Sequence, residues 1–163
     1  MVRKELEQEF LNQLTSNEDM VHKICNIYAS SYEEKQDLKQ EIIYQLWRSY
    51  PSFRGESKFQ TWMYRVALNT ALYFNRNKPL LTTDLRNIQI EEDNSLKELK
   101  EELQKLYRAI RTLNQIDRAI IFLYLERHGY EEIGNIVGIT AKNVGVRIVR
   151  IKDKLKQLIL NQD

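Results

Sequence analysis

The sequence has little proline, glycine and cysteine: 163 residues include two prolines, five glycines and one cysteine. Because proline and glycine interrupt regular structure, their scarcity beside many Leu, Ile, Glu, Lys and Gln residues predicts an all-α fold. A single cysteine excludes an internal disulfide framework and fits a reducing cytoplasm. We interpret Cys25, Met20 and Met63 as apolar core residues.

Long apolar runs and catalytic motifs are also missing. The first twenty residues are strongly charged, and no apolar run is long enough to span a bilayer, so we expect neither a signal peptide nor membrane insertion. The only histidines are His22 and His128, and no H-E-x-x-H, P-loop or paired-carboxylate pattern occurs. An enzyme such as a nuclease or hydrolase is therefore disfavoured, and we predict no catalytic residue, metal site or cofactor.

Charge is unevenly distributed along a chain whose formal net charge is only +2. Two basic blocks, residues 46–78 and 140–158, each contain six cations and one acid, whereas residues 1–45 and 79–105 are net acidic. Two separated basic blocks suggest two contacts with a polyanion. The alternative is two solvated helix faces.

Helical periodicity divides the chain into two parts. In residues 1–78 apolar stripes predict four helices, with the third from near Asp37 to Pro51 and the fourth over residues 58–75. We expect Phe59, Trp62, Met63, Val66, Thr70 and Phe74 on the buried face of the fourth helix. Residues 79–95 have weak periodicity and predict a linker. Helical signal resumes in residues 96–163, where Asn114 is a predicted N-cap of a helix ending near His128.

The last fifty residues have the pattern of a helix-turn-helix. A short helix is predicted over residues 130–137, Gly138 suits a left-handed C-cap, and Thr140 suits the N-cap of a helix to about Leu158. Beside the apolar stripe of that last helix lies a second, exposed face. Its members are Asn143, Arg147, Arg150 and Lys154. Such a face can enter a major groove, although solvated cations on an ordinary amphipathic helix remain the alternative.

Phe53-Arg54-Gly55-Glu56-Ser57 separates the third and fourth predicted helices. An aromatic ring and a guanidinium plane can stack on a base, and the glycine allows close backbone approach. Glu56 and Ser57 can form hydrogen bonds with a base edge, and Glu56 suits an amine donor. The segment thus suits an unstacked base. The alternative is a capped loop in which Ser57 serves only as an N-cap for the following helix.

Three segments together resemble one family. DLKQEIIYQLW, SFRGESKFQTWMYRVALNTA and YEEIGNIVGITAKNVGVRIVRIKDKL are similar to regions 2 and 4 of bacterial RNA polymerase sigma factors, in the extracytoplasmic-function (ECF) class. The resemblance implies two helical domains, region 2 at residues 1–78 and region 4 at residues 96–163. It also implies a transcription initiation factor whose partners are core RNA polymerase and promoter DNA. An anti-sigma factor is a further implied partner that no residue identifies.

The resemblance places functional residues on both domains. Residues implied in binding the largest subunits of core polymerase are Asp37, Leu38, Gln40, Glu41, Tyr44 and Arg48. Those implied at the −10 element are Phe53, Arg54, Gly55, Glu56 and Ser57 for a flipped base, Asn69 for its upstream part, and Arg65 and Arg76 for phosphates. Those implied at the −35 element are Lys142, Asn143, Arg147, Arg150 and Lys154. Trp47 and Trp62 fall on apolar stripes and are interpreted as core anchors.

This chain departs from the family pattern in region 4. Gly134 stands where alanine is usual, Gly129 where a Ser or Thr cap is usual, and Gly145 where a basic residue is usual. The main alternative function is a helix-turn-helix regulator that acts without binding polymerase. That alternative leaves the Asp37–Glu41 and Phe53–Ser57 segments unexplained.

Overall fold

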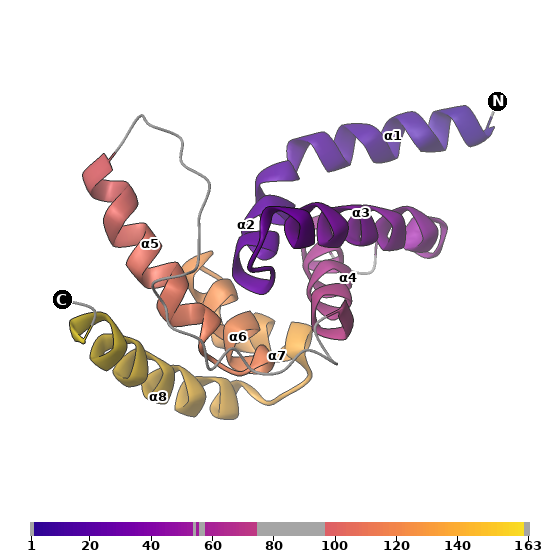
Figure 1. Cartoon of the computed structure of the whole chain (residues 1–163). Helices are drawn as coiled ribbons and strands as arrows, with labels where there is room; N and C mark the ends of the chain where they lie inside the picture. Colours follow the sequence, from indigo (N-terminus) through magenta and orange to yellow (C-terminus); the bar gives the residue numbers. More distant parts are fainter. Residues whose placement is uncertain (1, 54, 56–57, 75–96, 162–163) are drawn as a thin grey trace.

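The computed structural model describes residues 2–53, 55, 58–74 and 97–161. The predicted linker and the side chains of Arg54, Glu56, Ser57 and Arg76 lie outside the described residues. All regular structure within them is helical, which confirms the all-α prediction. The elements are α1 (Val2–Ser16), α2 (Glu18–Tyr28), α3 (Tyr32–Ser49), the 3-10 helix η1 (Tyr50–Ser52), α4 (Phe59–Phe74), α5 (Lys97–Arg111), α6 (Gln115–Leu125), α7 (Tyr130–Val137) and α8 (Ala141–Leu160) (Figure 1). None of the described helices is apolar enough over a sufficient length to cross a lipid bilayer.

Helices α2, α3 and α4 pack together, and α1 runs beside α3 (Figure 1). Leu38, Ile42 and Leu46 of α3 are fully buried, as their spacing predicts. Phe10 attaches α1 to this core, because its ring lies 5.1 Å from that of Trp47 and 5.3 Å from that of Tyr50. The interpretation of Cys25 as a core residue is confirmed, since it is buried.

Helix α3 begins at Tyr32, five residues before the predicted start at Asp37. The side chain of Ser31 accepts a hydrogen bond from the Glu34 amide at 3.1 Å, and the Glu34 carboxylate accepts one from the Ser30 amide. The first bond satisfies an amide that a helix start leaves unpaired, and the second ties the residue before the cap to the first turn; together they fix the earlier boundary. At its other end α3 stops where Pro51 enters η1, as predicted.

The buried face of α4 differs from the prediction. Met63 is buried as predicted, together with Tyr64, Ala67, Leu68 and Ala71. The other predicted residues are only half-buried, namely Phe59, Trp62, Val66, Thr70 and Phe74. The reason is that α4 contacts α2 and α3 on one side and α6 and α7 on another. The Tyr64 ring meets the rings of Phe122, at 6.0 Å, and His128, at 4.8 Å.

The helix-turn-helix forms with its predicted boundaries. Helix α7 spans Tyr130–Val137 and ends at Gly138, whose φ of +84° is in the left-handed region. Thr140 caps α8 by accepting a hydrogen bond from the Asn143 amide, and Asn114 caps α6 by accepting one from the Asp117 amide. Helix α6 itself ends at Leu125, before the predicted end near His128.

The two halves of the chain pack against each other through polar as well as apolar contacts. Tyr28 of α2 donates a hydrogen bond of 2.7 Å to the Gln115 carbonyl, and Arg111 donates one of 2.8 Å to the Asn26 carbonyl. Lys23 forms an ion pair of 3.0 Å with Glu126. These contacts join α2 to α5 and α6, and their existence was not predicted from the sequence.

Candidate nucleic-acid interface

The α3 face that the sequence assigns to polymerase is mostly accessible. Asp37, Gln40, Tyr44 and Arg48 are exposed, and Glu41 is half-exposed and accepts a hydrogen bond from Gln45 at 3.0 Å. Leu38 is the exception, because it is fully buried in the core. Its side chain is therefore not accessible in this structure, and a contact between Leu38 and polymerase stays a prediction.

A hollow of about 350 Å³ lies next to this face, between α1 and α3. The residues lining it are Glu7, Phe10, Leu11, Gln40, Ile43, Tyr44 and Trp47. Two of them, Gln40 and Tyr44, are predicted polymerase contacts, and Leu11 is an exposed apolar residue. The contribution of α1 to the lining of this hollow was not predicted from the sequence. The available signal was Leu11, an apolar residue directly after Phe10 in the sequence.

Phe53, which directly follows η1, is anchored by aromatic packing. Phe53 is half-buried, and its ring lies 5.2 Å from that of Trp62 and 5.7 Å from that of Phe59. Trp62 also meets Tyr50 at 6.1 Å, so a continuous aromatic cluster connects the segment to the core. Gly55 has a φ of +71° and open space around it, and a side chain would be strained at that φ. Phe53 is thus held by this cluster while part of its surface remains exposed.

On α4, Asn69 and Arg65 are both exposed. Arg65 donates a hydrogen bond of 3.4 Å to the Asn135 carbonyl of α7, and Thr61 donates one of 3.1 Å to the Glu132 carboxylate. Burial raises the pKa of the Glu132 carboxyl. The hydrogen bond and charge of His128 and the hydrogen bond of Thr61 lower it by more, so the pKa lies below its ordinary value. The α4 face with predicted −10 contacts therefore touches the helix-turn-helix.

On α8, four of the five predicted −35 residues are exposed, namely Lys142, Asn143, Arg150 and Lys154. Val146 and Val149 stand among them with 54% and 68% of their surface exposed. The fifth residue, Arg147, differs because it is half-buried and forms an ion pair of 3.0 Å with Asp117 of α6. Arg147 thus lies at the α6 side of the basic face.

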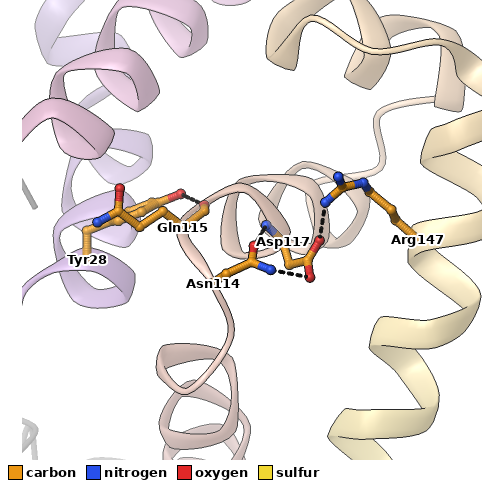
Figure 2. Close-up of polar contacts among 5 residues, drawn as sticks. All are labelled: Tyr28, Asn114, Gln115, Asp117 and Arg147. Carbon is orange, nitrogen blue, oxygen red and sulfur yellow. Dashed lines mark hydrogen bonds and ion pairs between the residues drawn. The ribbon is translucent and has the colours of Figure 1, made fainter. Parts of the chain in front are cut away.

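The first turn of α6 is contacted from two sides. Figure 2 shows Tyr28 approaching from α2 toward Gln115 and Arg147 approaching from α8 toward Asp117. Arg118, one residue further along α6, places its guanidinium 5.7 Å from the centre of the Tyr28 ring. This turn is therefore a junction between the two halves of the molecule and the last helix.

Two tyrosines beside α8 were missed by the sequence analysis. Tyr124 accepts a hydrogen bond of 2.6 Å from Lys152, whose ammonium lies 4.3 Å from the ring centre. Tyr130 lies against Gly145, where a Cβ would stand 3.3 Å from its ring. The sequence signal for the position of Tyr130 was Gly145, which departs from the family pattern. Within the described ranges, no three His, Cys, Asp or Glu side chains are grouped so as to hold a metal ion.

Comparisons with known proteins match both halves. Residues 14–79 match the family described as Sigma-70 region 2, and residues 103–155 match the one described as Sigma-70, region 4. The ECF RNA polymerase sigma-E factor of Escherichia coli K12 is 33% identical over 134 residues, covering 73% of this chain and 70% of that protein. The protein of the same name from Haemophilus influenzae is 32% identical over 138 residues, covering 76% and 73%.

Two solved structures share the fold along most of the chain. The sigma factor RpoE in complex with the anti-sigma factor NepR from Bartonella quintana has a TM-score of 0.74 at 20% identity, covering 93% of this chain and 97% of that one. CnrH in complex with the cytosolic domain of CnrY has a TM-score of 0.70 at 18% identity, covering 96% and 90%.

Proposed function

The chain belongs to the sigma-70 family, in its ECF class, and from that premise we propose which of its residues bind core RNA polymerase and which bind the promoter. It is a sigma factor that binds core polymerase and directs promoter recognition and melting. The observation that carries the residue assignment is that three separate surfaces, on α3, on α4 with the segment before it, and on α8, present side chains suited to those partners. None of these roles requires covalent chemistry by the chain.

We assign polymerase binding to the exposed face of α3 and the hollow beside it. Asp37, Gln40 and Arg48 supply polar contacts, and Tyr44 supplies an aromatic body with a polar tip. The hollow between α1 and α3 suits an apolar side chain of the partner, because Phe10, Leu11 and Trp47 line it. A regulator acting without polymerase would not need this surface, which disfavours that alternative.

We assign the −10 element to the segment 53–57 and the exposed side of α4. An extruded base would be received near Gly55, and Asn69 would read the adjoining duplex edge. Capture of a flipped base offsets part of the cost of opening, which is a few kcal/mol per unstacked base. The roles of Arg54, Glu56, Ser57 and Arg76 rest on the family resemblance alone.

Arg65 implies a change of arrangement on promoter binding. In the structure its guanidinium donates to the Asn135 carbonyl of α7. Helix α7 thereby packs on part of the α4 side that we assign to the −10 element, and DNA bound there would have to displace it. We therefore infer that the packing of α4 on α7 belongs to the free protein and is released in the complex with polymerase and DNA.

We assign the −35 element to α8, through Lys142, Asn143, Arg150 and Lys154, with Arg147 at its edge. The exposed Val146 and Val149 add apolar surface that suits thymine methyl groups.

The domain boundaries at residues 78 and 96, and a location in the cytoplasm where polymerase and DNA are found, belong to the same proposal. So does an anti-sigma partner, since the RpoE and CnrH structures are complexes with NepR and CnrY.

The test is promoter-specific run-off transcription with core polymerase and the purified chain. We expect specific transcripts, and we expect Asn69→Ala to lower the fraction of open promoter about tenfold or more, the loss of one base contact, while core binding is unchanged. Permanganate reactivity of unpaired thymines measures opening, and co-purification measures core binding. Asn161→Ala, an exposed asparagine at the far end of the chain, is the matched control.

Two outcomes would contradict the proposal. A complete lack of specific transcripts across genomic promoters would remove the sigma-factor function from this chain. Unchanged promoter opening in the Asn69→Ala protein would remove Asn69 from the −10 surface, whereas equal loss of core binding and opening would show a folding defect.

A further inference from the structure

The carboxylate of Asp117, in the first turn of α6, accepts hydrogen bonds at both of its oxygens. One carboxylate oxygen, Oδ1, accepts the 3.0 Å bond from Arg147 Nη1, and the other, Oδ2, accepts a 3.0 Å bond from Asn114 Nδ2. The Asp117 amide in turn donates to Asn114 Oδ1 at 2.8 Å. Figure 2 shows the three residues as one connected chain from the start of α6 to α8. The carboxylate is thereby fixed at both oxygens.

The ion pair is partly shielded from water, since the side chains of Arg147 and Asp117 are 32% and 17% exposed. Shielding strengthens a charge-assisted hydrogen bond relative to one on the open surface. This hydrogen bond uses one nitrogen of the Arg147 guanidinium, a planar group that carries five N–H donors in a fixed arrangement. Arg147 is thus fixed at one end while Nη2 and Nε have no hydrogen-bond partner among the described residues.

The position of the guanidinium limits what those donors can reach. Arg147 bends toward α6 (Figure 2), whereas Asn143, Arg150 and Val146 occupy the exposed face of α8. In a helix-turn-helix the exposed face of the second helix enters the groove and its flanks lie next to the DNA backbone. A cation at the flank contacts phosphate, and phosphate contacts set position without reading sequence.

We propose that Asp117 is a positioning residue for −35 binding. It holds Arg147 so that its remaining donors bind a backbone phosphate beside the −35 element, and base reading falls to the exposed face of α8. The proposal rests on the assignment of the −35 element to α8. Holding the side chain in advance reduces the conformational entropy that an arginine loses on binding.

The experiment uses holoenzyme reconstituted from core polymerase and the full chain, with a duplex promoter fragment mapped by run-off transcription. Dissociation constants are measured over a range of KCl concentrations for wild type, Asp117→Asn, Arg147→Ala and the double variant. The same set is measured on fragments with single −35 base-pair changes. Asp153→Asn is the matched control for charge alone, because it removes an exposed acid of α8 that has no arginine partner in the part of the chain that the structure describes.

We expect Asp117→Asn to weaken binding about fivefold and Arg147→Ala about tenfold, as for a charged hydrogen bond. Each should reduce the magnitude of the log K against log salt slope by about 1, the value for one phosphate contact. Both losses should be the same for every −35 sequence. In the Arg147→Ala background Asp117→Asn should have no further effect, and Asp153→Asn should not weaken binding.

Several results would overturn the proposal. Binding by Asp117→Asn that equals or exceeds wild type would show that the carboxylate competes for Arg147 instead of positioning it. A loss confined to one base pair, with an unchanged salt slope, would make Arg147 a base reader. A further loss in the double variant would show a structural role for Asp117. If wild-type holoenzyme does not depend on the −35 sequence at all, the assignment of α8 to that element is itself wrong.

Discussion

At the scale of single residues, two helical glycines of the helix-turn-helix, Gly134 and Gly145, have opposite surroundings. A Cβ at Gly134 would clash with the backbone carbonyl oxygen of Ile139, which directly follows the left-handed turn at Gly138. A Cβ at Gly145 would meet only the ring of Tyr130, 43% of whose surface is exposed. Backbone does not yield easily in so tight a turn, whereas an exposed ring can move by a few tenths of an ångström.

We expect the two alanine substitutions to change stability in opposite directions. Gly134→Ala gains about 1 kcal/mol of helix propensity but loses about 1–3 kcal/mol to overpacking, so the net effect is destabilising. Gly145→Ala keeps most of the propensity gain and stabilises by up to about 1 kcal/mol. Urea unfolding of each variant measures both changes. A stabilised Gly134→Ala protein would show that the turn at Gly138 relaxes freely.

At the scale of elements, α5 ends in an unusual buried cation. Arg111 is 1% exposed, donates from Nε to the Asn26 carbonyl of α2, and has no hydrogen-bond partner for Nη1 or Nη2 among the described residues. Burial, together with the charges of Arg118 and Arg108, lowers the pKa of its guanidinium to about 10. The group is therefore still charged at neutral pH, and its desolvation opposes the packing of α5 on α2.

We expect Arg111→Met to stabilise the packed protein. Methionine fills a similar volume without a charge to desolvate, and removing buried charge in this way is worth about 1–2 kcal/mol even after the Asn26 bond is lost. The melting temperature should rise by about 2–8 °C. Arg3→Met, the same change at an exposed position of α1, should leave it unaltered. A fall in the Arg111→Met protein would mean that the Asn26 bond outweighs desolvation.

At the scale of the whole molecule, two tyrosines lie between the halves. Tyr28 is buried and donates to the Gln115 carbonyl, and burial raises the pKa of its phenol despite the opposing charge of Arg118. Burial, with the nearby carboxylates of Glu126 and Glu132, raises the pKa of Tyr64 to about 12. Both phenols must stay neutral for the halves to remain packed, because an ionised phenolate is poorly accommodated at either place.

Alkaline pH should therefore separate the halves. A raised pKa gives stability that is complete below the unfolded value of about 10 and is lost as pH rises through the folded value. We expect the radius of gyration in small-angle scattering to increase around and above pH 12, and Tyr64→Phe to reduce the part of this change due to Tyr64. Tyr73→Phe, at an exposed tyrosine of α4, is the control. An unchanged radius across this range would contradict the expectation.

Much of the local structure followed from sequence alone. Asn114, Thr140 and Gly138 act at the helix ends where their chemistry predicts, because caps and left-handed turns depend on residues within a few positions. The buried stripe of α3 was also predictable, since one face of that helix meets a single core. The roles of the three functional segments came from their resemblance to regions 2 and 4 of sigma factors, which those short-range patterns alone do not supply.

Tertiary structure decided what depends on residues far apart in the chain. Tyr64 belongs to the core because α6 and α7 cover α4 on a second side, and no periodicity within α4 contains that information. Arg147 looked equivalent to Arg150 in the sequence, but only the packing of α6 on α8 brings Asp117 to it. Local interactions in the sequence determined the caps, the turn and the buried stripe of α3, because they involve residues a few positions apart. Packing decided the buried face of α4 and which exposed side chains remain free to bind.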